Sequence, residues 1–307
     1  MKIIFMGTPD FAVPSLKAIL EKGFDVSSVV TVPDRKIGRG LKLTFCPVKE
    51  FAIENELKLL QPDNLKDPLF IDNITNQNPD LIIVVAFRIL PENIFSIPKF
   101  GTINLHASLL PKYRGAAPIN WAIINGEKET GLTTFFINEK VDTGNIILQK
   151  KVSIFDEECF GELYRRLSTI GAELLISTIN LITENNYGLS MQDELLSTPA
   201  PKIFKENCKI DWDQEAVKIH NLIRGLSPYP AAFCYYKDQN LKIFKTNISG
   251  INSESEPGKL LIISRNLYVN TKDYLLEILE LQLEGKKKIK SSEFINSIPK
   301  NKDIVLS

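Results

Sequence analysis

Residues 81–87 read Leu-Ile-Ile-Val-Val-Ala-Phe and form the longest purely apolar run of the chain. A short, uninterrupted apolar run is typical of a strand in a parallel sheet that is covered on both faces. It falls far short of the roughly 20 residues that a helix needs to cross a bilayer. The run therefore predicts an internal strand of a layered α/β domain.

The segments on either side of this run repeat a strand–helix rhythm. Residues 2–6 and 26–32 have strand patterns, residues 57–60 form a weaker one, and a helical pattern ends at Gly23. Residues 102–106 form a further predicted strand on the C-terminal side. This alternation predicts a parallel sheet with right-handed crossovers, which is a Rossmann-like doubly wound α/β domain.

The pattern changes after Gly131. Residues 132–138 and 146–154 read as two antiparallel strands added to the sheet, and Asp156 precedes a long helix with apolar residues spaced by three and four. We expect this first domain to cover residues 1–188.

The second half of the chain has a different character. Residues 189–208 are polar and contain two prolines, which predicts a linker. Residues 209–307 contain one short helix pattern and five strand-like runs, a count typical of a small OB-like β-barrel.

Composition restricts the function classes. The chain has 307 residues, 44% of them apolar, with 37 Lys+Arg and 37 Asp+Glu, so its net charge is 37 − 37 = 0. Such values exclude disordered and coiled-coil classes, and any nucleic-acid binding must come from local patches. The 4 cysteines lie far apart in the sequence. The apolar stretch after Lys2 ends at Gly7, which is too short for the core of a signal peptide. We therefore expect a reduced, cytoplasmic protein without a disulfide framework.

The first strand–helix turn invites a dinucleotide-binding hypothesis. A Rossmann fingerprint needs three glycines, which let the backbone approach a pyrophosphate. Residues 7–12 read Gly-Thr-Pro-Asp-Phe-Ala, with one glycine and a proline. The turn therefore argues against an NAD enzyme, and it also suits an ordinary helix start with an early proline.

The segment 101–111 carries the most informative polar residues. Alternate residues of a strand face the same way, so Asn104 and His106 project together, about 7 Å apart. A carboxamide beside an imidazole at the end of a sheet strand can stabilise an oxyanion and move protons. The alternative is a hydrogen-bonded, half-buried histidine with a purely structural role.

Asp142 supplies a third group, in a Val-Asp-Thr-Gly turn between two predicted strands. Such an aspartate can be an ordinary Asx-turn residue. Together with Asn104 and His106 it would instead suit acyl transfer onto an amine, which needs both oxyanion stabilisation and proton transfer. No Ser or Cys nucleophile paired with a histidine stands out, so direct transfer without a covalent enzyme intermediate is favoured.

These motifs resemble those of the methionyl-tRNA formyltransferases, within the wider family of folate-dependent formyltransferases. The resemblance covers nearly the whole chain. It is carried by Asn104-x-His106, residues 108–111, 113–115 and 141–144, the turn 7–12, the Pro-Asp-Arg and Gly-Arg-Gly groups within 33–40, and Ile210-Asp211-Trp212. It implies a formyltransferase domain followed by a tRNA-binding barrel.

The resemblance also implies roles for individual residues. The formyl donor would be 10-formyltetrahydrofolate as cosubstrate, with no metal. Asn104 and His106 would stabilise the oxyanion, and Asp142 would orient His106. The folate would be held by Phe87, Arg88, Ile89, Leu90, Ser108, Leu109, Leu110 and Pro111. The acceptor would be the α-amino group of methionyl-initiator tRNA, bound by a monomer.

A basic loop at 34–49 is the feature best suited to tRNA. In the family such a loop enters the acceptor stem, and Arg39 would read the weak first base pair. The residues implied in tRNA binding are Arg35, Arg39, Lys42, Lys202, Lys205, Lys286 and Lys287. Lysine contacts to phosphates would position the tRNA without specifying its sequence. Read from charge alone, the same residues fit an ordinary solvated surface.

Three alternatives stay open at this point. The same chemistry could act on a small amine such as an amino-sugar nucleotide, because the catalytic motif responds only to donor and amine. A catalytically silent tRNA-binding protein would not need Asn104, His106 and Asp142 together. Formyl-folate hydrolysis would leave the basic loop and the C-terminal barrel unexplained.

Overall fold

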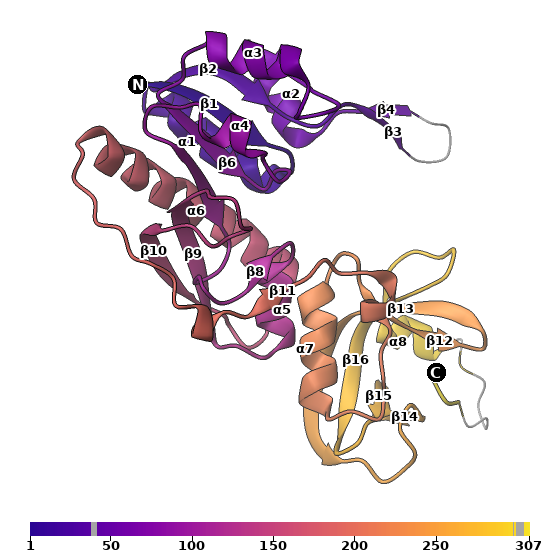
Figure 1. Cartoon of the computed structure of the whole chain (residues 1–307). Helices are drawn as coiled ribbons and strands as arrows, with labels where there is room; N and C mark the ends of the chain where they lie inside the picture. Colours follow the sequence, from indigo (N-terminus) through magenta and orange to yellow (C-terminus); the bar gives the residue numbers. More distant parts are fainter. Residues whose placement is uncertain (38–41, 297, 299–303) are drawn as a thin grey trace. The chain divides into compact units, whose positions relative to one another are not determined.

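The computed structural model describes residues 1–37, 42–296, 298 and 304–307 (Figure 1). The chain divides into two compact units, each made of three stretches of sequence. Unit 1 consists of residues 1–116, 130–152 and 164–200. Unit 2 consists of residues 117–129, 153–163 and 201–307.

Unit 1 is built on a seven-stranded sheet with the order β10-β9-β7-β6-β1-β2-β5. Its strands are β1 (Lys2–Gly7), β2 (Asp25–Val30), β5 (Leu59–Leu60), β6 (Leu81–Val85), β7 (Thr102–His106), β9 (Glu129–Phe136) and β10 (Ile146–Ser153). The strands from β7 to β5 are parallel to their neighbours, and β9 pairs antiparallel with β7. The predicted doubly wound sheet with an antiparallel addition is confirmed.

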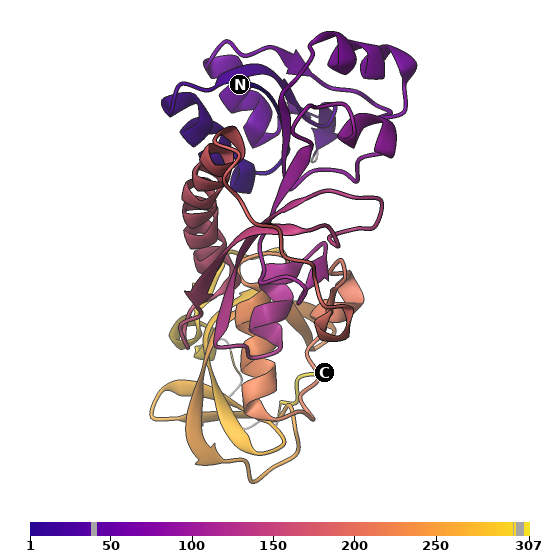
Figure 2. The same cartoon turned by 60° about the vertical axis from the view of Figure 1, so that its left-hand side comes forward.

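The apolar run that begins at Leu81 forms the middle strand of this sheet. All five residues of β6 are buried, as expected for a strand covered on both faces. The helices of the unit are α1 (Val13–Glu21), α2 (Pro47–Glu54), α3 (Pro68–Asn76), α4 (Glu92–Phe95) and most of α6 (Phe160–Thr183). Helix α6 packs on β9, where the hydroxyls of Thr134 and Thr178 lie 2.8 Å apart (Figure 2).

Two short ribbons complete unit 1. β3 (Arg35–Ile37) and β4 (Lys42–Thr44) form an antiparallel hairpin inside the predicted basic loop. β8 (Arg114–Gly115) pairs in parallel with β11 (Pro199–Ala200), which lies in the segment predicted as a linker. The second ribbon brings residues after α6 back to the segment that follows β7.

Unit 2 contains an antiparallel sheet with the order β12-β13-β16-β15-β14, and β17 pairs with β16. Its elements are β12 (Ala232–Tyr236), β13 (Gln239–Asn252), β14 (Leu260–Ile263), β15 (Asn266–Asn270), β16 (Tyr274–Leu283), β17 (Ile289–Lys290), α5 (Pro118–Ile124), α7 (Ala216–Leu226) and α8 (Ser291–Ile295). Irregular register along the 14-residue β13 lets the sheet curl. The C-terminal domain predicted as a small OB-like β-barrel is confirmed as an antiparallel β-sheet domain. Within the described residues, no helix is both long and apolar enough to span a membrane.

Helix α7 carries the second histidine of the chain, and the burial of this side chain predicts a pH dependence of the stability of unit 2. His220 is buried, its Nδ1 lies 3.0 Å from the Thr246 hydroxyl, and burial lowers its pKa. Below the ordinary value of about 6.5, the unfolded chain therefore binds a proton that the folded chain resists. Stability is expected to fall as the pH drops from 7.5 to 5.5, by at most about 1.4 kcal/mol, because the unfolded histidine takes up its proton only below about pH 6.5.

Urea unfolding at the two pH values tests this expectation. Both tryptophans, Trp121 and Trp212, lie in unit 2, so their fluorescence reports on that unit. The variant His220→Gln should show a smaller loss of unfolding free energy between pH 7.5 and 5.5 than the parent chain. An equal loss in both proteins would assign the pH dependence to other groups.

Candidate active site

His106 is the last residue of β7, and its imidazole is buried. Its Nε2 lies 2.8 Å from the carbonyl oxygen of Tyr113. Because a carbonyl only accepts hydrogen bonds, Nε2 carries a proton and donates it. The other ring nitrogen, Nδ1, lies 3.7 Å from Oδ2 of Asp142. The nitrogen that does not bind the Tyr113 carbonyl thus faces a carboxyl group.

Asp142 lies between β9 and β10, with a backbone φ of 54°. Its Oδ2 accepts a hydrogen bond of 2.9 Å from the amide of Gly115. The Asx-type bonds within this turn come instead from Asn138, whose Oδ1 accepts from the Lys140 amide and the Thr143 hydroxyl. The Asp142 carboxylate is therefore hydrogen-bonded to a segment distant in sequence, and Asn138 makes the Asx-type bonds of the turn in its place.

Asn104 lies two residues before His106 on β7 and is half-buried. Its neighbours Ile103 and Leu105 are buried in the core, as the alternation along the strand predicts. The Asn104 carboxamide makes no hydrogen bond within the described part of the chain. A donor on the same strand as His106 therefore remains available to a bound molecule.

The segment after β7 is fixed by buried hydrogen bonds. The Ser108 hydroxyl donates to the Lys112 carbonyl at 2.6 Å, which leaves it poorly suited to act as a nucleophile. The Leu110 amide donates to the Thr133 hydroxyl, and Gln149 Nε2 donates to the Leu110 carbonyl. Pro111 follows a cis peptide bond. Of the predicted folate residues in this segment, Ser108 and Leu110 are buried and Leu109 is half-buried.

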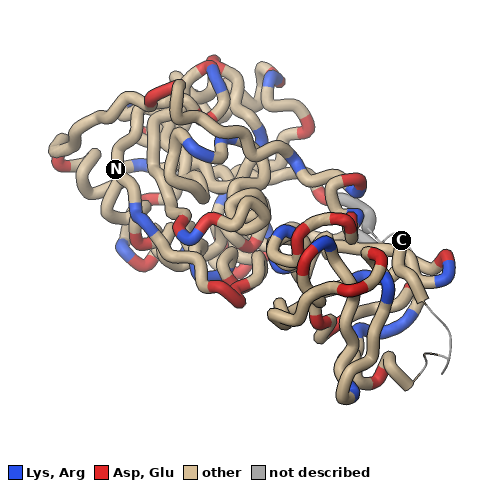
Figure 3. The backbone as a smooth tube through the Cα atoms, turned by 90° about the horizontal axis from the view of Figure 1, so that it is seen from below, with Lys and Arg blue, Asp and Glu red and all other residues tan. Residues whose placement is uncertain are grey.

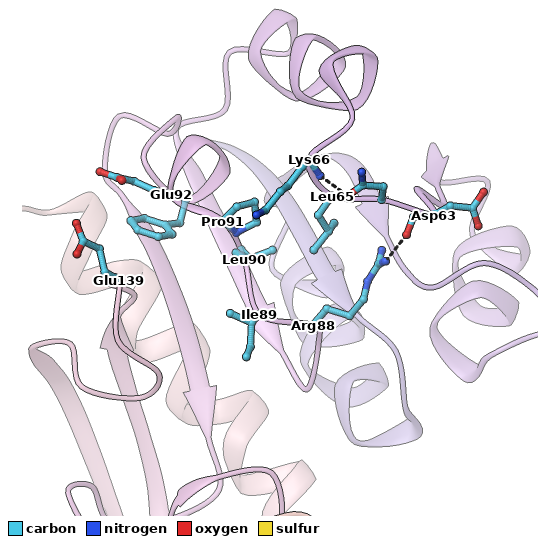
Figure 4. A pocket seen from close by; sticks show the side chains of 11 residues that line it. Asp63, Leu65, Lys66, Arg88, Ile89, Leu90, Pro91, Glu92 and Glu139 are labelled. Atoms are coloured by element: carbon cyan, nitrogen blue, oxygen red, sulfur yellow. Dashed lines mark hydrogen bonds between the residues drawn. The ribbon is translucent and has the colours of Figure 1, made fainter.

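A pocket of about 590 Å³ opens beside the end of β6 (Figure 4). Arg88, Ile89 and Leu90 line it, with residues 63–66 on the opposite wall. The Arg88 guanidinium donates to the carbonyls of Pro62 and Asp63, and Ile89 is 75% exposed. The predicted folate residues therefore fall into two groups, those that line this pocket and those that do not. Phe87 is half-buried against a core cluster, and neither it nor residues 108–111 line this pocket.

The predicted tRNA-binding residues are spread over both units. Arg35 and Lys42 belong to the β3–β4 hairpin, and Arg39 lies outside the described residues. Lys202, Lys205, Lys286 and Lys287 are exposed in unit 2. Lys202 and Lys205 lie 5.6 and 5.8 Å from the ring centres of Phe204 and Phe233. Figure 3 shows basic and acidic residues interspersed along the described part of the chain, so any basic surface there is local.

One residue of the predicted basic loop has a structural role. Lys49, the last residue of the predicted loop 34–49, lies on α2. It is buried there and forms an ion pair of 2.6 Å with Asp34. The Gln61 amide and then the Lys49 ammonium, as hydrogen-bond donors, hold the pKa of Asp34 below its ordinary value. This pair anchors the base of the β3–β4 hairpin.

Sequence reasoning missed the groups that surround the three predicted catalytic residues. The partner of His106 is the backbone carbonyl of Tyr113, which no side-chain pattern reveals. Gln192 and Thr198 contact the loops of Asp142 and Tyr113, although they lie in the segment predicted as a linker. Among the described residues, no group of three or more His, Cys, Asp or Glu is arranged to hold a metal ion.

Comparison with known proteins decides the family. The family model described as "Formyl transferase" matches residues 1–179, and "Formyl transferase, C-terminal domain" matches residues 202–299. The chain belongs to the formyl transferase family. The predicted resemblance is therefore confirmed, and His106, Asn104 and Asp142 lie in the part that matches the first of these models.

Relatives within the formyl transferase family match the chain from end to end. It is 46% identical to the "Methionyl-tRNA formyltransferase" of Flavobacterium johnsoniae over 303 residues, 97% of this chain and 96% of that one. It is 47% identical to the protein of the same name from Clostridium novyi, covering 97% and 98%.

A solved structure shares the fold at lower identity. The N-formyltransferase from Helicobacter canadensis, in complex with folinic acid and dTDP-3-aminofucose, has a TM-score of 0.69 and 23% identity. The match covers 94% of this chain and 100% of that one. At this identity, the likeness shows the fold of a formyl transferase.

Proposed function

We propose that this formyl transferase moves the formyl group of 10-formyltetrahydrofolate to the α-amino group of methionyl-initiator tRNA, for translation initiation. The observation that carries the proposal is identity of 46% and 47% to relatives named for this activity, over nearly the full length of both chains. That match includes the C-terminal unit as well as the first. The amino-sugar alternative has only distant structural relatives in its support.

The reaction forms a bond between the acceptor nitrogen and the formyl carbon, and then breaks the bond to N10 of the folate. In the proposed mechanism, Nδ1 of His106 accepts the proton that the attacking amine loses. Asp142, 3.7 Å away, stabilises the resulting imidazolium. His106 then returns the proton to N10 as it leaves.

The tetrahedral intermediate carries negative charge on the formyl oxygen. We assign its stabilisation to the N–H of the Asn104 carboxamide and to the protonated ring of His106. The carbonyl of Tyr113 keeps Nε2 protonated, so the proton transfer uses Nδ1. No step requires a nucleophilic side chain, in keeping with the engaged hydroxyl of Ser108.

The binding sites follow from the same proposal. We place the folate against Phe87, Arg88, Ile89 and Leu90 and the segment 108–111, with the pocket of Figure 4 at one end. We place the acceptor end of the tRNA at the β3–β4 hairpin through Arg35, Arg39 and Lys42. Lys202, Lys205, Lys286 and Lys287 supply phosphate contacts. The enzyme acts in the cytoplasm as a monomer, with residues 209–307 as its tRNA-binding domain.

The decisive experiment compares three acceptors with 10-formyltetrahydrofolate as donor. These are methionyl-initiator tRNA, methionyl-elongator tRNA and free methionine. We expect rapid formylation of the first alone. Failure on all three, with the folate still bound, would move the acceptor to a small amine.

Arg39→Ala is expected to reduce the preference for initiator over elongator tRNA. A well-placed arginine contributes about 1–3 kcal/mol of discrimination between base pairs, so the ratio of the two kcat/KM values should fall about tenfold or more. The KM for the folate should stay the same, because the residue reads only the tRNA. Arg165→Ala, an exposed position on α6, is the matched control. An unchanged ratio in Arg39→Ala would remove the assigned role.

A further inference from the structure

Residues 190–200 form a strap that runs along the active-site loops of unit 1. Ser190 exchanges backbone hydrogen bonds of 2.9 and 3.0 Å with Ile146, at the start of β10. At the other end, the Thr198 hydroxyl accepts from the Tyr113 amide at 2.9 Å, and the Thr198 carbonyl accepts from the Arg114 amide. The strap is therefore attached to both sides of the site.

Gln192 lies between these attachments and uses both ends of its amide. Its Nε2 donates to the carbonyl of Asp142 at 3.0 Å and to the carbonyl of Gly144 at 2.8 Å. Its Oε1 accepts from Arg114, at 3.1 Å from Nε and 2.8 Å from a terminal nitrogen. One half-buried side chain thus joins the turn of Asp142 to the segment of Arg114.

Arg114 has a second partner on the strap. Its guanidinium donates two hydrogen bonds to the Glu194 carboxylate, at 2.8 and 3.0 Å. This donor holds the pKa of Glu194 below its ordinary value. Arg114 is thereby fixed in one orientation, and its neighbour Gly115 donates its amide to the Asp142 carboxylate. The backbone and the side chain of Asp142 are both held through this network.

We propose that Gln192 is a positioning residue, which sets the place of Asp142 against His106 for the proton transfer. The proposal rests on the function given above for Asp142. The turn of Asp142 has a left-handed backbone at a non-glycine residue, a conformation that persists only where its surroundings hold it. Gln192 supplies two donors to that turn, one on Asp142 itself and one on Gly144.

Only a primary amide fits this position. Two carbonyl oxygens need N–H donors, and the guanidinium needs an acceptor. Glutamate in its place would keep the acceptor for Arg114 but would set a carboxylate against two carbonyls. Methionine has a similar length and removes all four hydrogen bonds. The two variants therefore separate the donor function from the contact with Arg114.

The experiment measures formylation of methionyl-initiator tRNA by Gln192→Glu and Gln192→Met. Because small displacements of a catalytic group are costly, kcat is expected to fall about 10- to 100-fold in both. The KM for each substrate should stay within about threefold, since binding groups are unchanged. Equal losses in the two variants would assign the effect to the donors. Unchanged kcat in both would overturn the proposal.

A double-mutant cycle shows whether Gln192 acts through Asp142. In the background of Asp142→Asn, Gln192→Met should cause no more than about a twofold further loss, because the group it positions has already been altered. A loss as large as in the parent chain would mean that Gln192 acts independently, and would overturn the proposal. Gln77→Met, a glutamine at the end of α3, is the matched control and should keep full activity.

A spectroscopic readout separates this inference from the proposed function. The chain contains only 2 histidines, so the ring-nitrogen signals of His106 and His220 are easily assigned by NMR. Gln192→Met should shift the His106 signals and leave those of His220 in place. This shift is expected whichever acceptor the enzyme uses. Inactivity of the parent chain on methionyl-tRNA would therefore refute only the proposed function, whereas unmoved His106 signals would refute the positioning role.

Discussion

His106→Ala is expected to lower kcat for formyl transfer about 10²- to 10³-fold, the loss typical of removing a general base that also stabilises an oxyanion. The variant lacks the ring nitrogen that lies 3.7 Å from the Asp142 carboxylate. The KM for the folate should change little, because His106 does not line the pocket formed by Arg88, Ile89 and Leu90. Steady-state kinetics with saturating donor and methionyl-initiator tRNA measures both values.

The second histidine provides the control for this variant. His220 belongs to unit 2, outside the predicted site, so folded His220→Gln should keep kcat within about twofold at pH 7.5. A near-normal kcat in His106→Ala would return His106 to the structural alternative, in which its bond to Tyr113 only completes the end of β7.

Gly144→Ala is expected to damage stability and catalysis together. A β-carbon at this position would fall on the carbonyl oxygen of Phe136, a backbone atom that cannot move aside. The turn must therefore shift, at a cost of about 3 kcal/mol in the free energy of unfolding. Asp142 lies in the same turn, and its displacement should lower kcat about 100-fold.

Urea unfolding and steady-state kinetics of Gly144→Ala test both parts. Gly188→Ala is the matched control, because no described atom beyond its neighbours in the chain lies within 4 Å of the added β-carbon, and its backbone is not left-handed. It should leave the unfolding free energy and kcat unchanged. Parent-like stability in Gly144→Ala would show that the turn can open without cost.

Local sequence signals explain how much of the fold could be predicted. The apolar run 81–87 is typical of a covered strand, which the structure forms over Leu81–Val85, and its neighbours alternate in the manner of a doubly wound sheet. The period of two along 102–106 placed Asn104 and His106 on one face. The glycine and aspartate at 142–144 predict a turn there, whereas the role of Asp142 in orienting His106 is what the family resemblance implies.

The network around Asp142 could not be predicted, for physical reasons. The partner of His106 is a backbone carbonyl, which every residue possesses. Gln192 lies 50 residues beyond Asp142 in sequence, in a segment without periodicity. Its contacts depend on the path of the chain after α6. The polar composition of this segment predicts only a linker. The path of the strap is set by pairing with β8 and β10, which is a long-range property.

The strap also defines how short an active fragment of this enzyme can be. A truncation that ends with α6, at Thr183, retains Asn104, His106 and Asp142. It nevertheless discards the β11 edge and the amide that fastens the turn of Asp142. A catalytic fragment must therefore extend at least to Ala200, where unit 1 ends, and it also carries residues 117–129 and 153–163, which belong to unit 2. A truncated or chimaeric protein should therefore be joined after the strap and not at the end of α6.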